Sequence, residues 1–150
     1  VFGEGAFGME ATRIGLDLSK SPFEVHGVDG RGEVILRRTV RRGQFQDTFT
    51  GLPRCVIGLE SCGTAHEWGR RLTDLGHEVW LVAPHAVAPY RDSVGRGASL
   101  AQVLCEALGD EGTRFTRLQP SSRLARFALM RIPRQILGGL RSVARSERSG

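Results

Sequence analysis

The sequence has no long hydrophobic run, because no stretch approaches the roughly 20 apolar residues that a membrane helix needs. It also has few cysteines: there are three, an odd number, without the close paired spacing of a zinc site or a disulfide framework. Internal repeats and low-complexity tracts are absent as well. We therefore expect a cytoplasmic protein with reduced cysteines and no membrane association. Its 150 residues suffice for about one domain with a real core.

Lysine is almost missing, since Lys20 is the single lysine among 21 basic residues, and the net charge of +5 therefore rests on arginine. Arginine suits phosphate binding, but a GC-rich genome also encodes it, so the charge alone is weak evidence for a nucleic-acid partner. The charge is uneven, with nine arginines against two acidic residues from Glu111 onward. We expect this C-terminal quarter to be the polyanion-binding surface, and its candidate contacts are Arg114, Arg117, Arg123 and Arg126.

Hydrophobic patterning predicts a mixed α/β fold in which three antiparallel strands come first and strand–helix alternation follows. The predicted strands cover residues 12–18, 23–28, 33–40, 55–60 and 78–82. The predicted helices cover residues 44–52, 63–75 and 98–108, and we expect them on both faces of the sheet. After Ala83 the prolines and Gly97 predict a loop. Over residues 121–143 the helical pattern is interrupted by Pro133 and a glycine pair.

Two acidic residues stand inside apolar, strand-like runs: Asp17 within residues 14–18 and Glu60 at the end of residues 56–60. A carboxylate on a buried strand is costly unless something neutralises it, and a divalent metal ion is the usual remedy. Two ions about 4 Å apart across a scissile phosphate need oxygen ligands from several strands. Asp17 and Glu60 are therefore candidate catalytic and metal-binding residues. The alternative is that Asp17 caps a turn and Glu60 is an ordinary solvated acid.

Several stretches in a fixed order resemble one family. They are Ile14-Gly15-Leu16-Asp17-Leu18-Ser19-Lys20, Val25-His26-Gly27-Val28-Asp29, Gly58-Leu59-Glu60-Ser61-Cys62-Gly63, Leu75-Gly76-His77-Glu78-Val79, Ala83-Pro84 and Pro89-Tyr90. Over residues 13–107 the chain resembles the catalytic domain of the DEDD transposases of bacterial insertion sequences, of the IS one-ten type. That domain is similar to the Holliday-junction resolvase RuvC and is ribonuclease-H-like. The resemblance implies a DNA transposase or recombinase N-terminal catalytic domain in which Asp17 and Glu60 bind Mg²⁺ or Mn²⁺ for strand cleavage.

The chain departs from that family just before Leu104-Cys105-Glu106-Ala107, where the family has two further aspartates three residues apart. Those positions are Gly97 and Leu100 here, and neither side chain binds a metal. Asp92 lies five residues away from the expected position and is a poor substitute. We therefore predict weak or lost metal affinity and little strand cleavage, as in a degenerate, truncated transposase.

The resemblance also divides the chain. We expect residues 1–11, which include Met9 as a candidate start, to be a disordered or upstream extension. Residues 12–109 would form the RuvC-like domain, and residues 110–150 a basic helical tail at the truncated start of the family's arm. The family's nucleophilic serine has no counterpart here. The resemblance implies DNA as a partner, and a guide (bridge) RNA and a second copy of the chain as further possible partners.

Two other functions stay open at this point. One is a non-catalytic nucleic-acid-binding fragment of the same origin. The other is an actin-like ATPase or sugar kinase, because Ile14 to Leu18 and the Asp29-Gly30-Arg31-Gly32 turn resemble that superfamily's first phosphate loop; the glycines and threonine expected after Asp17 are absent. Lys20 is a candidate phosphate contact because it follows Asp17 by three residues. The four histidines and two tryptophans are interpreted as structural.

Overall fold

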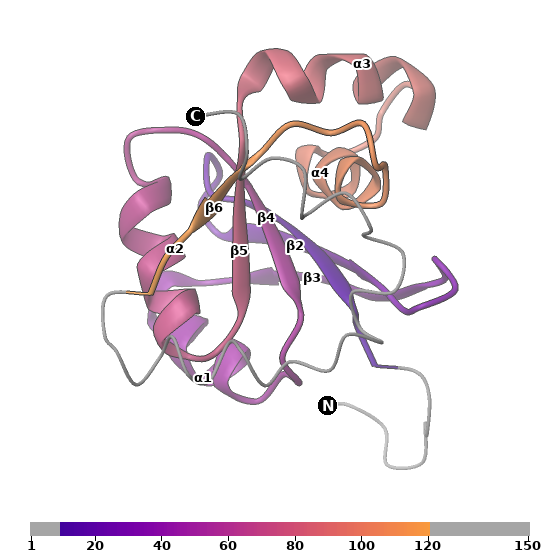
Figure 1. Ribbon diagram of the computed structural model, residues 1–150. Coiled ribbons are helices and arrows are strands. Elements are labelled where there is room, and N and C mark those ends of the chain that lie inside the picture. The colour runs from indigo at the N-terminus through magenta and orange to yellow at the C-terminus, as the bar shows by residue number, and fades with distance from the viewer. Residues whose placement is uncertain (1–9, 121–150) are drawn as a thin grey trace.

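The computed structural model describes residues 10–120, drawn in colour in Figure 1. Its strands are β1 (Arg13–Asp17), β2 (Phe23–Val28), β3 (Val34–Val40), β4 (Val56–Glu60), β5 (Glu78–Val82) and β6 (Thr116–Leu118). Its helices are η1 (Arg42–Gln44), α1 (Phe45–Thr50), α2 (Ala65–Asp74), α3 (Pro84–Val94) and α4 (Leu100–Leu108). The predictions for residues 1–9 and 121–150, Arg123 and Arg126 included, lie outside the described residues.

The six strands form one mixed sheet in the order β3-β2-β1-β4-β5-β6. β1, β2 and β3 pair antiparallel, β4 and β5 run parallel to β1, and β6 pairs antiparallel with β5. This confirms the predicted antiparallel start followed by strand–helix alternation. The short edge strand β6 was not predicted, because three residues carry too little pattern to indicate a strand.

Helices cover both faces of the sheet, as predicted (Figure 1). On one face α1 and α2 pack against the sheet through a cluster of aromatic rings, in which Phe45 and Trp68 are 4.7 Å apart between centroids. On the other face α4 lies directly on β1, close enough that a Cβ atom at Gly15 would be 1.9 Å from the carbonyl oxygen of Ala101. Only glycine permits that approach.

The strand period of two decides which side chains meet α4. Leu16 points into the aromatic-rich core, whereas Gly15 contacts α4 and Asp17, two residues on, shares its face. The Cys105 thiol lies 3.7 Å from the Arg13 carbonyl, while Ala101 lies over Gly15. The chain direction of α4 is therefore opposite to that of β1, and the N-terminus of α4 lies toward Asp17.

The prediction of a loop after Ala83 is wrong, because helix α3 begins at Pro84. Pro84 stands at the start of the helix, where its missing N–H costs nothing. Pro89 does remove an internal bond, but Val87, Tyr90 and Val94 recur at helical spacing and pack with α4. This packing outweighs the cost of one proline.

The contacts of His77 confirm that this histidine has a structural role. It is buried, its Nδ1 is 3.3 Å from the Cys55 amide nitrogen, and its Nε2 is 2.7 Å from the Phe49 carbonyl oxygen. The ring therefore accepts from Cys55, donates to Phe49 and joins the end of α1 to the start of β4. Trp68 and Trp80 are likewise buried in cores. Within residues 10–120 no helix is both long and apolar enough to cross a membrane.

Candidate functional site

Asp17 and Glu60 lie at the carboxyl ends of neighbouring parallel strands. Leu16 of β1 pairs with Leu59 of β4, so the residues that follow them stand next to each other across the sheet. Both acidic residues are in phase with glycines, Gly15 and Gly58, that face α4. The structure thus brings the two predicted metal ligands together at one edge of the sheet and on one face.

The Asp17 side chain is 1% exposed and is held by the turn that follows it. Its Oδ1 accepts hydrogen bonds from the Ser19 amide at 2.9 Å and from the Ser19 hydroxyl at 2.5 Å. This is the turn-capping arrangement weighed as the alternative role of Asp17. It orients the carboxylate without supplying a positive charge.

Glu60 is half-buried, and its neutralising partner is an arginine on α3. The Nη2 atom of Arg91 lies 3.5 Å from Glu60 Oε2. That oxygen is nevertheless buried and has no hydrogen-bond partner within the described residues, because 3.5 Å is longer than an ordinary N–H···O hydrogen bond. One acceptor at the site is therefore under-satisfied, which is unusual for a buried carboxylate. The sequence did not indicate Arg91, because its segment was predicted as a loop.

A third carboxylate, Glu24, stands opposite Asp17 on β2. Lys20 holds it in an ion pair with Nζ and Oε2 3.0 Å apart. This hydrogen bond is the main reason that the pKa of Glu24 lies below its ordinary value, and the Ser99 hydroxyl acts in the same direction. Lys20, the predicted phosphate contact, is thus engaged by Glu24. Within residues 10–120 no three His, Cys, Asp or Glu side chains gather closely enough to hold a metal ion.

The positions where aspartates were expected, Gly97 and Leu100, flank the N-terminus of α4. Gly97 has φ +84°, a left-handed conformation that favours glycine. Ser99 caps the helix by accepting a 3.1 Å hydrogen bond from the Gln102 amide, and Leu100 is the first helical residue. Leu100 packs against the apolar cluster of α3 and α4, and Gly97 lines the same groove as Glu24, the cross-strand partner of Asp17. Asp92, the weak substitute, is exposed on α3.

Two of the arginines predicted to contact nucleic acid are described, and they differ. Arg114 is exposed. Arg117 on β6 lies with its Nε 3.1 Å from Oε1 of Glu78, a side chain that is 1% exposed. The Glu78 oxygen also accepts a 2.8 Å bond from the Trp80 indole. Arg117 therefore neutralises a buried carboxylate.

Comparison with curated proteins gives significant matches over most of the chain. A protein of Pseudomonas aeruginosa, "Probable family 20 transposase", is 40% identical over 124 residues, which are 83% of this chain and 37% of that protein. The transposase for insertion sequence element IS1328 of Yersinia enterocolitica is 32% identical over 121 residues, 81% of this chain and 36% of its own length. The chain is homologous to part of these transposases.

A third transposase, that of insertion sequence element IS1111A of Coxiella burnetii, is 33% identical over 104 residues. It is matched over 69% of this chain and 29% of its own length. The chain thus spans about a third of the length of the transposases it matches. No protein-family model matches it. No solved structure matches it significantly.

Proposed function

We propose that the chain is the catalytic-domain part of a DNA transposase, with a ribonuclease-H-like fold and with Asp17 and Glu60 as the remainder of a divalent-metal site. The observation that carries the proposal is the placement of these two carboxylates at adjacent ends of β1 and β4. The strand order, with three antiparallel strands followed by two parallel ones, supports the fold. The homologous transposases support the reaction class.

The donor set suits one weakly held hard cation. Mg²⁺ binds through one or two carboxylates and keeps several waters, and Glu60 Oε2 is a buried oxygen without a hydrogen bond. When bound, such an ion would polarise a phosphate oxygen and lower the pKa of an attacking water. Asp17 would meet it in an orientation fixed by Ser19.

The same geometry argues for impaired cleavage. Arg91 already offsets the charge of Glu60, so a cation has to displace that guanidinium before Glu60 is free. Gly97 and Leu100 have no ligand atoms in their side chains, and a second ion needs further carboxylates. These observations favour a second candidate function, a nucleic-acid-binding fragment without cleavage activity. In both cases DNA is the expected partner; a guide RNA and a second copy of the chain are further proposed partners.

Calorimetric titration with Mn²⁺ tests the metal site. We expect weak, millimolar-range binding to the native chain that disappears in Asp17→Asn and in Glu60→Gln. The matched control is Asp92→Asn, which removes an exposed carboxylate outside the pair and should leave binding unchanged. Binding that survives both substitutions, or a native chain that does not bind Mn²⁺, would refute the proposed site.

A further inference from the structure

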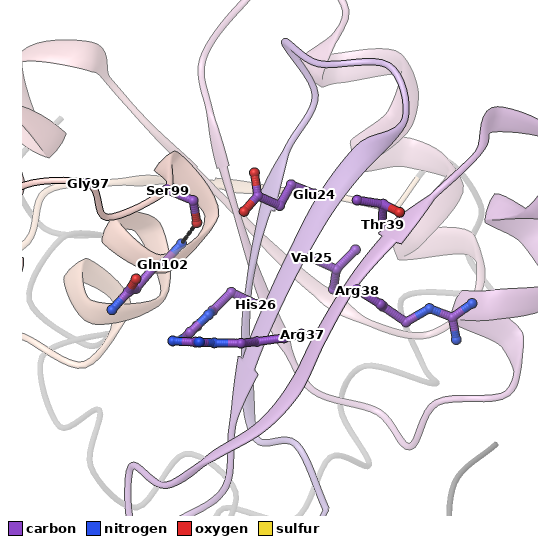
Figure 2. A pocket seen from close by; sticks show the side chains of 9 residues that line it. All are labelled: Glu24, Val25, His26, Arg37, Arg38, Thr39, Gly97, Ser99 and Gln102. Atoms are coloured by element: carbon purple, nitrogen blue, oxygen red, sulfur yellow. Dashed lines mark hydrogen bonds between the residues drawn. The ribbon is translucent and has the colours of Figure 1, made fainter.

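A groove beside the acidic pair is lined by side chains that suit a phosphodiester backbone. It lies on the face of β2 and β3 next to the N-terminal turn of α4, with a volume of about 430 Å³. Figure 2 shows Glu24 and His26 of β2 and Arg37 of β3 facing Ser99 and Gln102 of α4. Arg37 extends alongside His26 toward Gln102.

We propose that this groove binds the phosphate backbone of a nucleic-acid strand and leads it to the Asp17–Glu60 pair. The inference rests on the proposed function, because it assigns a place to the nucleic acid on which such a domain acts. It does not rest on the metal site, since arginine and amide contacts to phosphates need no cation.

Charged groups of both signs surround the groove. Glu24 is paired with Lys20, so its negative charge is offset. Burial lowers the pKa of His26 and the charge of Arg37 lowers it further, whereas Glu106 of α4 and Glu24 oppose this shift. Arg37 pairs with His26 across the two strands and extends toward α4, while Arg38 pairs with Val25 and its side chain extends away from α4 (Figure 2). Arg37 is therefore the cation that meets a phosphate in the groove.

Further exposed arginines follow along the same edge of the sheet. Residues 37–42 read Arg-Arg-Thr-Val-Arg-Arg, with four exposed arginines and no acidic residue between them. Arg37 shares the face of His26, whereas the guanidinium of Arg42 lies 5.8 Å from the centroid of the Phe23 ring, which belongs to the core under α1 and α2 on the other face. The edge of the sheet is therefore positively charged on both faces, which adds a general attraction for a polyanion to the contacts inside the groove.

The position of the groove links it to the candidate site. Glu24, at one end of the lining, is the cross-strand partner of Asp17. Ser99 and Gln102 belong to the same turn of α4 that borders Asp17. A strand lying in the groove thus passes directly to the carboxyl end of β1.

Fluorescence anisotropy with the full chain tests the groove. The probes are labelled single-stranded DNA, double-stranded DNA and single-stranded RNA of matched sequence, measured in EDTA so that the metal site plays no part. The test variant is Arg37→Gln. The control is Arg70→Gln, which makes the same charge change on α2, on the opposite face of the sheet. Circular dichroism confirms that both variants fold.

We expect the groove variant to bind roughly tenfold more weakly to at least one probe, and the probe that is affected identifies the nucleic acid. Loss of one phosphate contact should reduce the slope of log K against log salt by about 0.7 for single strands or about 0.9 for duplex DNA. The control variant should keep the native slope. Gln102→Glu, which adds a carboxylate without touching an arginine, should also weaken binding.

Three results would overturn the proposal that the groove binds a nucleic-acid strand. Equal weakening by Arg37→Gln and Arg70→Gln would indicate a general charge effect. A loss of nucleic-acid binding in the variant Arg123→Gln/Arg126→Gln alone would assign binding to the C-terminal segment. Native protein that binds none of the probes would show that the groove is no binding site. Because the groove variant leaves Asp17 and Glu60 intact, its Mn²⁺ titration should match the native one. A failure of the groove is thereby separated from a failure of the metal site.

Discussion

Gly15 is the position at which one added carbon should do the most damage to the site. In Gly15→Ala the new Cβ would lie 1.9 Å from the Ala101 carbonyl oxygen and 2.8 Å from the Cys105 nitrogen. The first distance falls about 1.5 Å short of the 3.4 Å at which ordinary contact begins. Both atoms belong to the backbone of α4, so no side-chain rotation relieves the clash.

The magnitude follows from how α4 is held. Relief requires α4 to move away from β1 by more than about 1 Å, which opens the packing of Leu104 and Leu108 at the same time. Overpacking of a core typically costs about 1–3 kcal/mol, and a backbone clash belongs at the upper end. We therefore expect the free energy of unfolding of Gly15→Ala to fall by about 3 kcal/mol, which for a chain of this size lowers the melting temperature by roughly 10 °C.

Urea unfolding followed by circular dichroism measures this effect. The matched control is Gly43→Ala, since a Cβ at Gly43 meets no heavy atom within 4 Å. We expect the control to stay within about 1 kcal/mol of the native chain. If Gly15→Ala and Gly43→Ala unfold at the same urea concentration, then α4 does not lie on β1 as described, and the arrangement of the groove and the acidic pair loses its support.

Three further predictions concern polar contacts within the fold. Burial lowers the pKa of His77 in the folded state, so the unfolded chain binds the proton more tightly and stability should fall as the pH drops below about 6.5. In His77→Gln the free energy of unfolding at pH 7 should fall by about 1–3 kcal/mol, and its dependence on pH, measured by urea unfolding, should become flatter. An unchanged dependence of stability on pH would contradict the role of His77. Arg117→Gln leaves Glu78 buried without its cation, so the free energy of unfolding should fall by about 2 kcal/mol. The loss is smaller than for a fully buried pair because Arg117 is a third exposed. A chemical denaturation midpoint equal to that of the native chain would argue against this ion pair. Tyr90→Phe removes hydroxyl hydrogen bonds of 2.6 and 2.7 Å that connect α3 to the loop after α4, so the free energy of unfolding should fall by about 1 kcal/mol. Thermal melting measures this loss, and an unchanged melting temperature would contradict it.

Most of the sheet could be predicted because its strands carry strong local patterns. Apolar runs bounded by turn residues predicted the first five strands, and Glu60 was predicted at a strand end, whereas Asp17 was predicted inside a strand that the structure ends at this residue. The neighbouring positions of the two acids depend on the long-range pairing of β1 with β4. Periodicity does not state which strands are adjacent, so this pairing was not predicted.

The features that the sequence did not reveal depend on tertiary contacts. Two prolines concealed α3, and with it Arg91 as the partner of Glu60. The groove was missed for a different reason: His26 and Arg37 lie on separate strands and meet only through the register of β2 with β3. A signal was nonetheless present on β2, where the polar residues Glu24 and His26 alternate with Phe23 and Val25, but β3 has three consecutive exposed polar residues and shows no such alternation.

The central claim, a metal site reduced to two carboxylates, is tested most directly by restoring the missing ligands. We would titrate Mn²⁺ into the native chain, into Gly97→Asp/Leu100→Asp, and into Gly97→Asn/Leu100→Asn, which has the same backbone strain at the left-handed position 97 but no added charge. The account predicts weak binding by the native chain and the Asn variant, and binding at least tenfold tighter by the Asp variant. Tight native binding that Asp17→Asn abolishes, or an Asp variant no better than the Asn variant, would contradict it.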